Sequence, residues 1–185
     1  MKHTRRLLEI LARHRAQATF FPIGRNVRRH SDLVRRVMDA GHEVGLHDDH
    51  HLPPPLLPPF LFRIEFERAA AAVRAAIGAP ARFYRPPFGV MTRAQAERVR
   101  GWGVTPVLGD VYPRDPDRPG TEAIVARTLA GLRPGSILIL HEASGYGDLD
   151  RSQTLAAVDR ILAVTAERGW RAVAVGALID AAVRT

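Results

Sequence analysis

The sequence predicts a single α/β domain over residues 1–185, with helices and strands alternating along the chain. Short apolar runs of β-prone residues recur, and longer segments with apolar residues at helical spacing separate them. A chain of this length can bury a substantial core without disulfides, and the sequence contains no cysteine. Such regular alternation favours a parallel sheet or a (β/α) barrel.

The first elements follow from these patterns in chain order. Residues 4–15 place leucines and an isoleucine on one side and arginines opposite, which predicts an amphipathic helix. Residues 18–24 (ATFFPIG) predict a short buried strand. Residues 26–41 predict a helix that stops at Gly41, and residues 42–47 predict a second short strand.

A proline-rich segment, residues 51–62 (HLPPPLLPPFLF), interrupts the alternation. Five prolines remove backbone donors and fix φ, so we expect a stiff, extended wall in place of a helix or central strand. After this segment helices and strands alternate again, beginning with a helix at 63–78 ended by Gly78 and a strand and loop at 81–89. A helix at 92–103 capped by Thr92 and a strand at 104–110 come next, followed by a helix at 121–135 capped by Thr121. The last predicted elements are a buried strand at 136–142 (SILILHE), a helix at 150–169, a strand at 170–175 and a helical tail.

The charge distribution does not by itself predict a nucleic-acid-binding protein. The formal net charge is +8, but arginines supply nearly all of the positive charge and are scattered through helical segments. A solvated basic surface accounts for this pattern, and no nucleic-acid-binding motif accompanies it. No apolar run approaches the roughly 18 to 20 residues of a spanning helix. The first residues show no signal peptide, so the chain as written fits the cytoplasm; a longer precursor would also allow the cell envelope or secretion.

The residues that could carry chemistry follow predicted strands, where βα loops form the sites of α/β folds. His47 to His51 (HDDHH) contains three histidines and two aspartates. One tight turn could bring two imidazoles to one metal ion, and a polar loop explains the same composition equally well. Arg85 and His141 also end strands. For Arg85 a helix-capping role is the alternative, and for His141 a satisfied core histidine is the alternative to a general acid or base.

Taken together, four ordered segments resemble the polysaccharide deacetylase family, also called the NodB homology domain. They are RRLLEILARHRAQATFFPIG, GHEVGLHDDHH, YRPPFG and SILILHE, and the likeness covers essentially the whole chain. The resemblance implies a distorted (β/α) barrel of the NodB-like type with its first strand missing. It also implies a hydrolase that removes acetyl groups from carbohydrates, or cleaves related C–N amide bonds, with one divalent metal, expected to be Zn²⁺.

The resemblance also implies roles for individual residues. It makes His47 and His51 the metal ligands, while His50 points elsewhere. Arg85 would orient the catalytic base, and His141 would be the general acid. Asp115 would tune the acidity of His141, with Asp110 as the weaker candidate for this role. The resemblance further implies substrate binding by Pro87, Phe88, Leu138 and Leu140, and it places the two leucines near an acyl methyl pocket.

One departure from the family pattern stands out. The first family motif carries an Asp-Asp pair, which supplies the general base and a third metal ligand, and neither aspartate is present. Glu9 is the only acid between Met1 and Arg15, and it lies within the predicted helix. The domain is therefore expected to be N-terminally incomplete, and three explanations stay open: a start at an internal methionine, a fragment, or a shortened homologue that has lost catalysis.

Two smaller differences from the family pattern accompany the missing motif, and together they set what we expect of the chain's activity. Asp48 stands where the family has Ser or Thr, and Pro116 stands where it has a tryptophan. We expect the chain as written to bind metal weakly, with Asp48 or Asp49 as a substitute ligand, and to be essentially inactive. The alternative function is a non-catalytic homologue that binds a glycan or an anionic polymer. Chitin oligomers, peptidoglycan, other acetylated glycans and small amides all remain candidate substrates, and the oligomeric state is not predicted.

Overall fold

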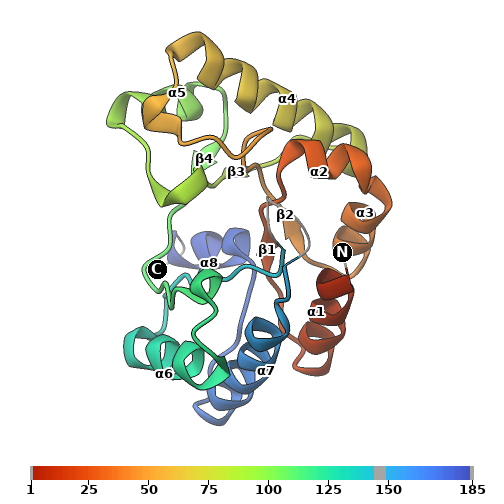
Figure 1. The fold of residues 1–185 in the computed structure, drawn as a ribbon, viewed down its shortest axis with the longest axis vertical. Helices are drawn as coiled ribbons and strands as arrows, with labels where there is room; N and C mark the ends of the chain where they lie inside the picture. Colours follow the sequence, from red (N-terminus) through yellow and green to blue (C-terminus); the bar gives the residue numbers. More distant parts are fainter. Residues whose placement is uncertain (1, 144–148, 184–185) are drawn as a thin grey trace. The chain divides into compact units, whose positions relative to one another are not determined.

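The fold is seen in a computed structural model that describes residues 2–143 and 149–183 (Figure 1). The chain forms two compact units. The first unit comprises residues 1–18 and 109–185, and the second unit comprises residues 19–108. The second unit is thus one continuous stretch, whereas the first is assembled from both ends of the chain. The organisation of residues 1–185 as a single catalytic domain stays a prediction.

The second unit is built on short parallel strands. β1 (Thr19–Phe20) pairs with β2 (Glu43–Val44), and β3 (Phe83–Tyr84) pairs with β4 (Thr105–Pro106). An isolated parallel bridge between Leu46 and Tyr84 connects the two pairs. The strands therefore follow chain order, as expected when a helix or loop carries the chain from each strand to the next. This arrangement confirms the predicted α/β class with parallel pairing.

Two helices stand where one was predicted at residues 26–41. α2 (Gly24–Arg29) and α3 (Ser31–Asp39) are separated by His30, whose φ of −141° and ψ of 42° interrupt the helical path. The apolar spacing runs through both helices, so the pattern alone could not locate the break.

The prediction for residues 51–62 was wrong in its second half. A 3₁₀ turn, η1 (Pro54–Leu56), is followed by α4 (Pro59–Ile77), which begins inside the proline-rich segment. Proline is tolerated in the first helical turn, because the backbone N–H groups there have no helical acceptor. α4 ends as predicted at Gly78, which adopts the left-handed φ of 75°.

α5 (Arg93–Gly101) confirms the predicted cap at Thr92. The Thr92 hydroxyl accepts the backbone N–H of Gln95 at 3.2 Å, and the Gln95 side chain accepts the Thr92 N–H at 2.9 Å. The predicted cap at Thr121 was wrong. Gly120 occupies the N-cap, and the Thr121 hydroxyl donates to the carbonyl of Gln153 instead.

The first unit is mainly helical. Its helices are α1 (Lys2–Arg13), α6 (Thr121–Gly131), α7 (Ser152–Glu167) and α8 (Val175–Ala182). A 3₁₀ turn, η3 (Asp115–Asp117), also belongs to this unit, whereas η2 (Pro87–Gly89), like η1, lies in the second unit. Facing sides of α6 and α7 bury a core that contains Ile124, Val125, Ala157 and Ile161. α1 packs against α7, and His14 Nε2 lies 2.7 Å from Asp159 Oδ1.

Two segments of the first unit that were predicted to be strands pair less than expected or not at all. Residues 136–142 are half-buried and form a single parallel bridge, between Leu138 and Val111. Residues 170–175 form no strand, and α8 begins at Val175. Leu138 and Leu140 of the first segment pack against the core between α6 and α7, and Ala174 and Val175 of the second are buried, so apolar side chains are covered without a long ladder. No helix in the described part of the chain is both long and apolar enough to cross a membrane.

Candidate functional site

The loop after β2 brings His47 and His51 together in the second unit. Their ring centroids lie 4.8 Å apart with the ring planes at 66°. Asp48 and His51 have φ values of 51° and 60°, in the left-handed region that few non-glycine residues adopt. These two positions fold the chain back on itself, so histidines four residues apart converge without a helix.

The tautomer of His47 suits a metal ligand. Its Nδ1 lies 2.6 Å from the backbone carbonyl oxygen of Arg85, which can only accept a hydrogen bond. The proton of neutral His47 is therefore on Nδ1, and Nε2 carries the lone pair that a metal requires. Donation of the second ring nitrogen to a backbone carbonyl is the usual arrangement around metal-ligating histidines.

The aspartates of the loop are fully buried, and each is bound by another side chain. Asp48 Oδ2 accepts the hydroxyl of Tyr84 at 3.0 Å. Asp49 accepts both terminal nitrogens of Arg28, at 2.7 and 2.9 Å. Bidentate pairing of this kind holds a carboxylate firmly, so Asp49 is committed to Arg28.

His50 turns to Glu65 on α4. The backbone N–H of His50 donates to Glu65 Oε2 at 2.7 Å, and His50 Nδ1 lies 2.8 Å from Glu65 Oε1. Within the described residues, no group of three His, Asp or Glu side chains is arranged to hold a metal ion. The two imidazoles thus fit a divalent ion as nitrogen donors but fall short of the three protein ligands usual in catalytic zinc sites.

Burial dominates the titration behaviour around this loop. It raises the pKa of Asp48 to about 7, against a smaller lowering by the Tyr84 hydrogen bond, and nearby Glu65 and Asp49 raise it further. Burial also raises the pKa of the Tyr84 phenol, and the charge of Asp48 adds to that effect. Both groups are thus favoured in their neutral forms.

Arg85 and Phe88 complete the described surroundings of the histidine pair. The Arg85 guanidinium lies 4.3 Å from the centroid of the Phe21 ring, and burial lowers its pKa to about 10. Its Nε is buried and has no hydrogen-bond partner in the described part of the chain. The Phe88 ring lies 4.7 Å from that of His51 and is 59% exposed, whereas Pro87 is buried.

The first unit holds the predicted proton donor and its partner. The backbone N–H of His141 donates to Asp115 Oδ2 at 2.9 Å, and His141 Nδ1 lies 2.9 Å from Asp115 Oδ1. Asp115 is fully buried, whereas the His141 side chain is 35% exposed. The carboxylate holds a proton on Nδ1, so Nε2 is the atom from which protonated His141 would donate.

The other site residues predicted in the first unit, Asp110, Leu138 and Leu140, have partners different from those of His141 and Asp115. Asp110 accepts the N–H of Ile137 at 2.6 Å and the hydroxyl of Ser136 at 3.0 Å, at the exposed end of its loop. Leu138 and Leu140 pack against the core between α6 and α7. The structure therefore brings Asp115 to His141, and it places Asp110 with surface partners.

Sequence reasoning missed several polar residues that support these groups. Thr154 and Arg151 contact Asp115, and Glu65, Arg28 and Tyr84 hold the loop of His47 to His51. Each lies at least 15 residues from its partner along the chain, and no local pattern marks such a pair.

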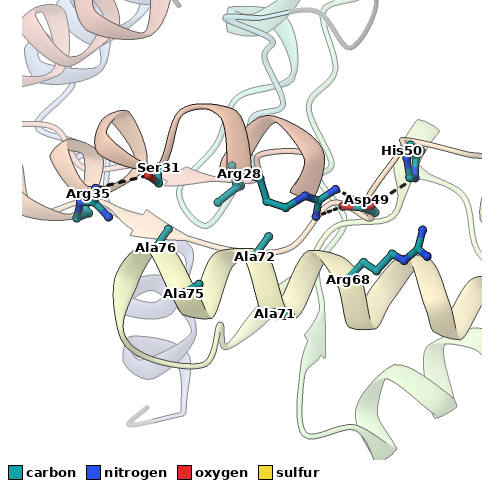
Figure 2. Close-up of a pocket in the computed structure, with 11 residues that line it drawn as sticks. Arg28, Ser31, Arg35, Asp49, His50, Arg68, Ala71, Ala72, Ala75 and Ala76 are labelled. Carbon is teal, nitrogen blue, oxygen red and sulfur yellow. Dashed lines mark hydrogen bonds and ion pairs between the residues drawn. The ribbon is translucent and has the colours of Figure 1, made fainter.

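A groove of about 650 Å³ runs along α4 in the second unit, and Figure 2 shows its lining. Alanines of α4 form its floor, and arginines lie along it. Asp49 and His50 line one end, where Asp49 is bound to Arg28. Neither His47 nor His51 lines this groove, so it is separate from the candidate metal pair.

Comparison with known proteins identifies the family. The polysaccharide deacetylase family model matches residues 1–107, and the chain belongs to this family. A chitooligosaccharide deacetylase of Sinorhizobium fredii is 36% identical over 178 residues, which cover 90% of this chain and 81% of the relative. A peptidoglycan-N-acetylglucosamine deacetylase of Bacillus cereus is 33% identical over 179 residues, covering 96% and 82%.

Solved structures share the fold. A family 4 carbohydrate esterase from Streptomyces lividans, in complex with acetate, is 28% identical with a TM-score of 0.84, over 93% of this chain and 85% of that one. A CE4 family pseudoenzyme from Bacillus anthracis is 25% identical with a TM-score of 0.88, over 96% of this chain. The match spans 60% of the pseudoenzyme's own chain. These neighbours confirm the predicted NodB-like fold type.

Proposed function

We propose that this protein is a metal-dependent hydrolase that removes acetyl groups from an acetylated glycan. Family membership and relatives that carry the names of carbohydrate deacetylases support this function. The observation that carries it is the convergence of His47 and His51, with His47 held in the tautomer that a metal ligand needs. Acetylated chitooligomers and peptidoglycan fragments are the substrate classes to test first.

The proposal assigns a divalent ion, expected to be Zn²⁺, to His47 and His51. The family is metal-dependent. When bound, such an ion polarises a carbonyl and lowers the pKa of a coordinated water. Two imidazoles alone bind weakly, which fits a site that needs a further oxygen ligand. Arg85 is proposed to orient the base of the reaction, with Pro87 and Phe88 contacting the substrate.

The proton balance of the reaction gives His141 its role. Water adds to the acetyl carbon and the C–N bond breaks, which yields acetate and leaves a sugar nitrogen that must gain a proton. Imidazolium His141 can donate from Nε2, because Asp115 keeps the other proton on Nδ1 and stabilises the charged ring. Leu138 and Leu140 are proposed to contact the acetyl methyl group.

Metal binding provides the first test. Zinc titration by calorimetry should show that His47→Ala and His51→Ala each weaken binding by at least about tenfold, since each change removes a direct ligand. His50→Ala is the matched control, because His50 belongs to the same loop but bonds Glu65. Equal zinc affinity in all three variants and the parent chain would contradict the assignment.

Acetate release separates the hydrolase from its alternative, a non-catalytic homologue that binds a glycan or anionic polymer. The pseudoenzyme neighbour lends some support to that alternative, whereas the relatives named as carbohydrate deacetylases favour the hydrolase. A hydrolase should release acetate from chitooligomers in the presence of zinc and lose this activity in His141→Ala. Glycan binding without acetate release, weakened by salt, would instead establish the binding protein.

A further inference from the structure

Among the described residues, three hydrogen bonds hold the carboxylate of Asp115, and they divide unequally between its two oxygens. Oδ1 faces the Nδ1 of His141 at 2.9 Å. Oδ2 accepts two donors, the backbone N–H of His141 at 2.9 Å and the hydroxyl of Thr154 at 3.2 Å. Because both donors act on Oδ2, rotation of the carboxylate is restricted and Oδ1 stays directed at the ring.

Thr154 is placed for this contact by the start of α7. It lies in the first turn of that helix and is 1% exposed. The preceding N-cap residue, Arg151, is 4% exposed, and its Nη1 lies 3.4 Å from the backbone carbonyl of Asp115. The beginning of α7 is therefore attached to Asp115 at two points, through its side chain and through its backbone.

The cost of burial makes the Thr154 hydroxyl important. Asp115 is fully buried, and a buried carboxylate is tolerated only when its oxygens are hydrogen-bonded. Arg151 bonds the backbone carbonyl rather than the carboxylate. Within the part of the chain that the structure describes, Thr154 is consequently the side-chain donor to the Asp115 carboxylate besides His141 itself.

We infer that Thr154 is a positioning residue for the proton donor. Its hydroxyl fixes the Asp115 carboxylate, Asp115 holds His141 as the Nδ1–H tautomer, and Nε2 is thereby presented outward. This inference deepens the proposed function, on which the catalytic meaning of His141 rests. The hydrogen-bond chain itself does not depend on any activity.

The test compares three single variants of the full chain. Thr154→Val keeps the shape and removes the hydroxyl, and Thr154→Ser restores a hydroxyl. Thr165→Val is the matched control, because Thr165 is a buried threonine of the same helix whose hydroxyl donates to the carbonyl of Leu162 at 2.9 Å. Both valine variants lose one buried hydrogen bond, so both should lower Tm by roughly 2–4 °C.

The deciding readout is the tautomer of His141, read from ¹⁵N chemical shifts of its ring at a pH where it is neutral and assigned by loss of the signal in His141→Gln. The parent chain, Thr154→Ser and Thr165→Val should show Nδ1–H. Thr154→Val should shift toward Nε2–H, the form that unconstrained histidine prefers. An unchanged Nδ1–H signal in Thr154→Val, or its absence from the parent chain, would overturn the inference.

Acetate release supplies a second readout. If the chain deacetylates chitooligomers, Thr154→Val should lower kcat by about 10- to 100-fold with KM nearly constant, and Thr154→Ser should recover most of it. A loss no larger than that of Thr165→Val would count against positioning. If no variant or parent releases acetate, the proposed function fails while the ring spectra still decide the role of Thr154.

Discussion

Asp48 and Asp49 are adjacent and fully buried, yet they differ as potential metal ligands. Arg28 engages both oxygens of Asp49, whereas Asp48 Oδ1 has no hydrogen-bond partner in the described part of the chain. Asp48 thus has the uncommitted oxygen of the two. With a pKa of about 7 it is only partly ionised at neutral pH, which weakens it as a ligand until an ion is close enough to displace the proton.

Gly24 is required for the packing that holds Asp49 in place. A Cβ added there would lie 2.5 Å from Asp49 Oδ1 and 2.8 Å from Ala69 Cα, so backbone atoms of α4 would have to move. We expect Gly24→Ala to lower the free energy of unfolding by about 1–3 kcal/mol, as overpacking does. Urea unfolding followed by circular dichroism measures the change.

Gly101 provides the control for this substitution. It is the last residue of α5, and a Cβ there would meet nothing within 4 Å. Gly101→Ala should leave stability unchanged or raise it by up to about 1 kcal/mol, because alanine favours the helix. A Gly24→Ala variant as stable as Gly101→Ala would show that α2 and α4 are less closely packed than described.

The residues of the candidate site were predictable to different degrees. His47, His51, Arg85 and His141 lie within short ordered motifs that resemble a known family, so sequence alone could select them. Thr154 could not be selected, because its partner Asp115 is 39 positions away and a threonine in a first helical turn has ordinary local explanations. The choice between Asp110 and Asp115 as the partner of His141 likewise could be made only from the three-dimensional path of residues 109–141.

At the scale of elements, α1 and α7 are joined by a pH-dependent contact. A hydrogen bond from His14 lowers the pKa of Asp159, burial opposes it, and Arg13 lowers it further. A lowered folded-state pKa stabilises the protein above the ordinary aspartate value of 3.8, and the stabilisation is lost as pH falls through the folded-state value. The α1–α7 contact should therefore weaken in acid.

Asp159→Asn tests this contact. The variant should have a lower Tm than the parent at neutral pH, and the difference should vanish in acid, once the pH has fallen below the lowered folded-state pKa of Asp159 and the parent side chain is protonated as well. Asp39→Asn, at an exposed aspartate of α3 without an ion pair in the described residues, should change Tm little at either pH. A constant difference between parent and Asp159→Asn across this range would show that the contact is not electrostatic.

Helices were predicted more closely than strands, for a physical reason. Apolar spacing and caps are local, so α5 and α7 differ from prediction by only a few residues at their ends. A strand needs a distant partner, and the strands of this chain pair over two residues each. The run at 136–142 has the composition of a buried strand, but its leucines pack on helices and leave one bridge.

At the scale of the whole molecule, the fold does not decide activity. The chain shares its fold with a carbohydrate esterase and with a pseudoenzyme, and a mutant of that pseudoenzyme is described as having restored enzymatic activity. One scaffold is therefore compatible with both activity and inactivity. Under the proposed function, the donor set around His47 and His51 decides which of the two this protein is.

The pairing of α1 with α7 also has a consequence for biosynthesis. α1 leaves the ribosome well before α7, because Asp159 follows His14 by 145 residues. Ile10 and Leu11 of α1 are buried in the folded protein, and α1 has no α7 to pack against in the meantime, while the continuous second unit can collapse on its own segment. A nascent chain stalled before residue 152 would therefore display the apolar side of α1, a surface suited to chaperone binding.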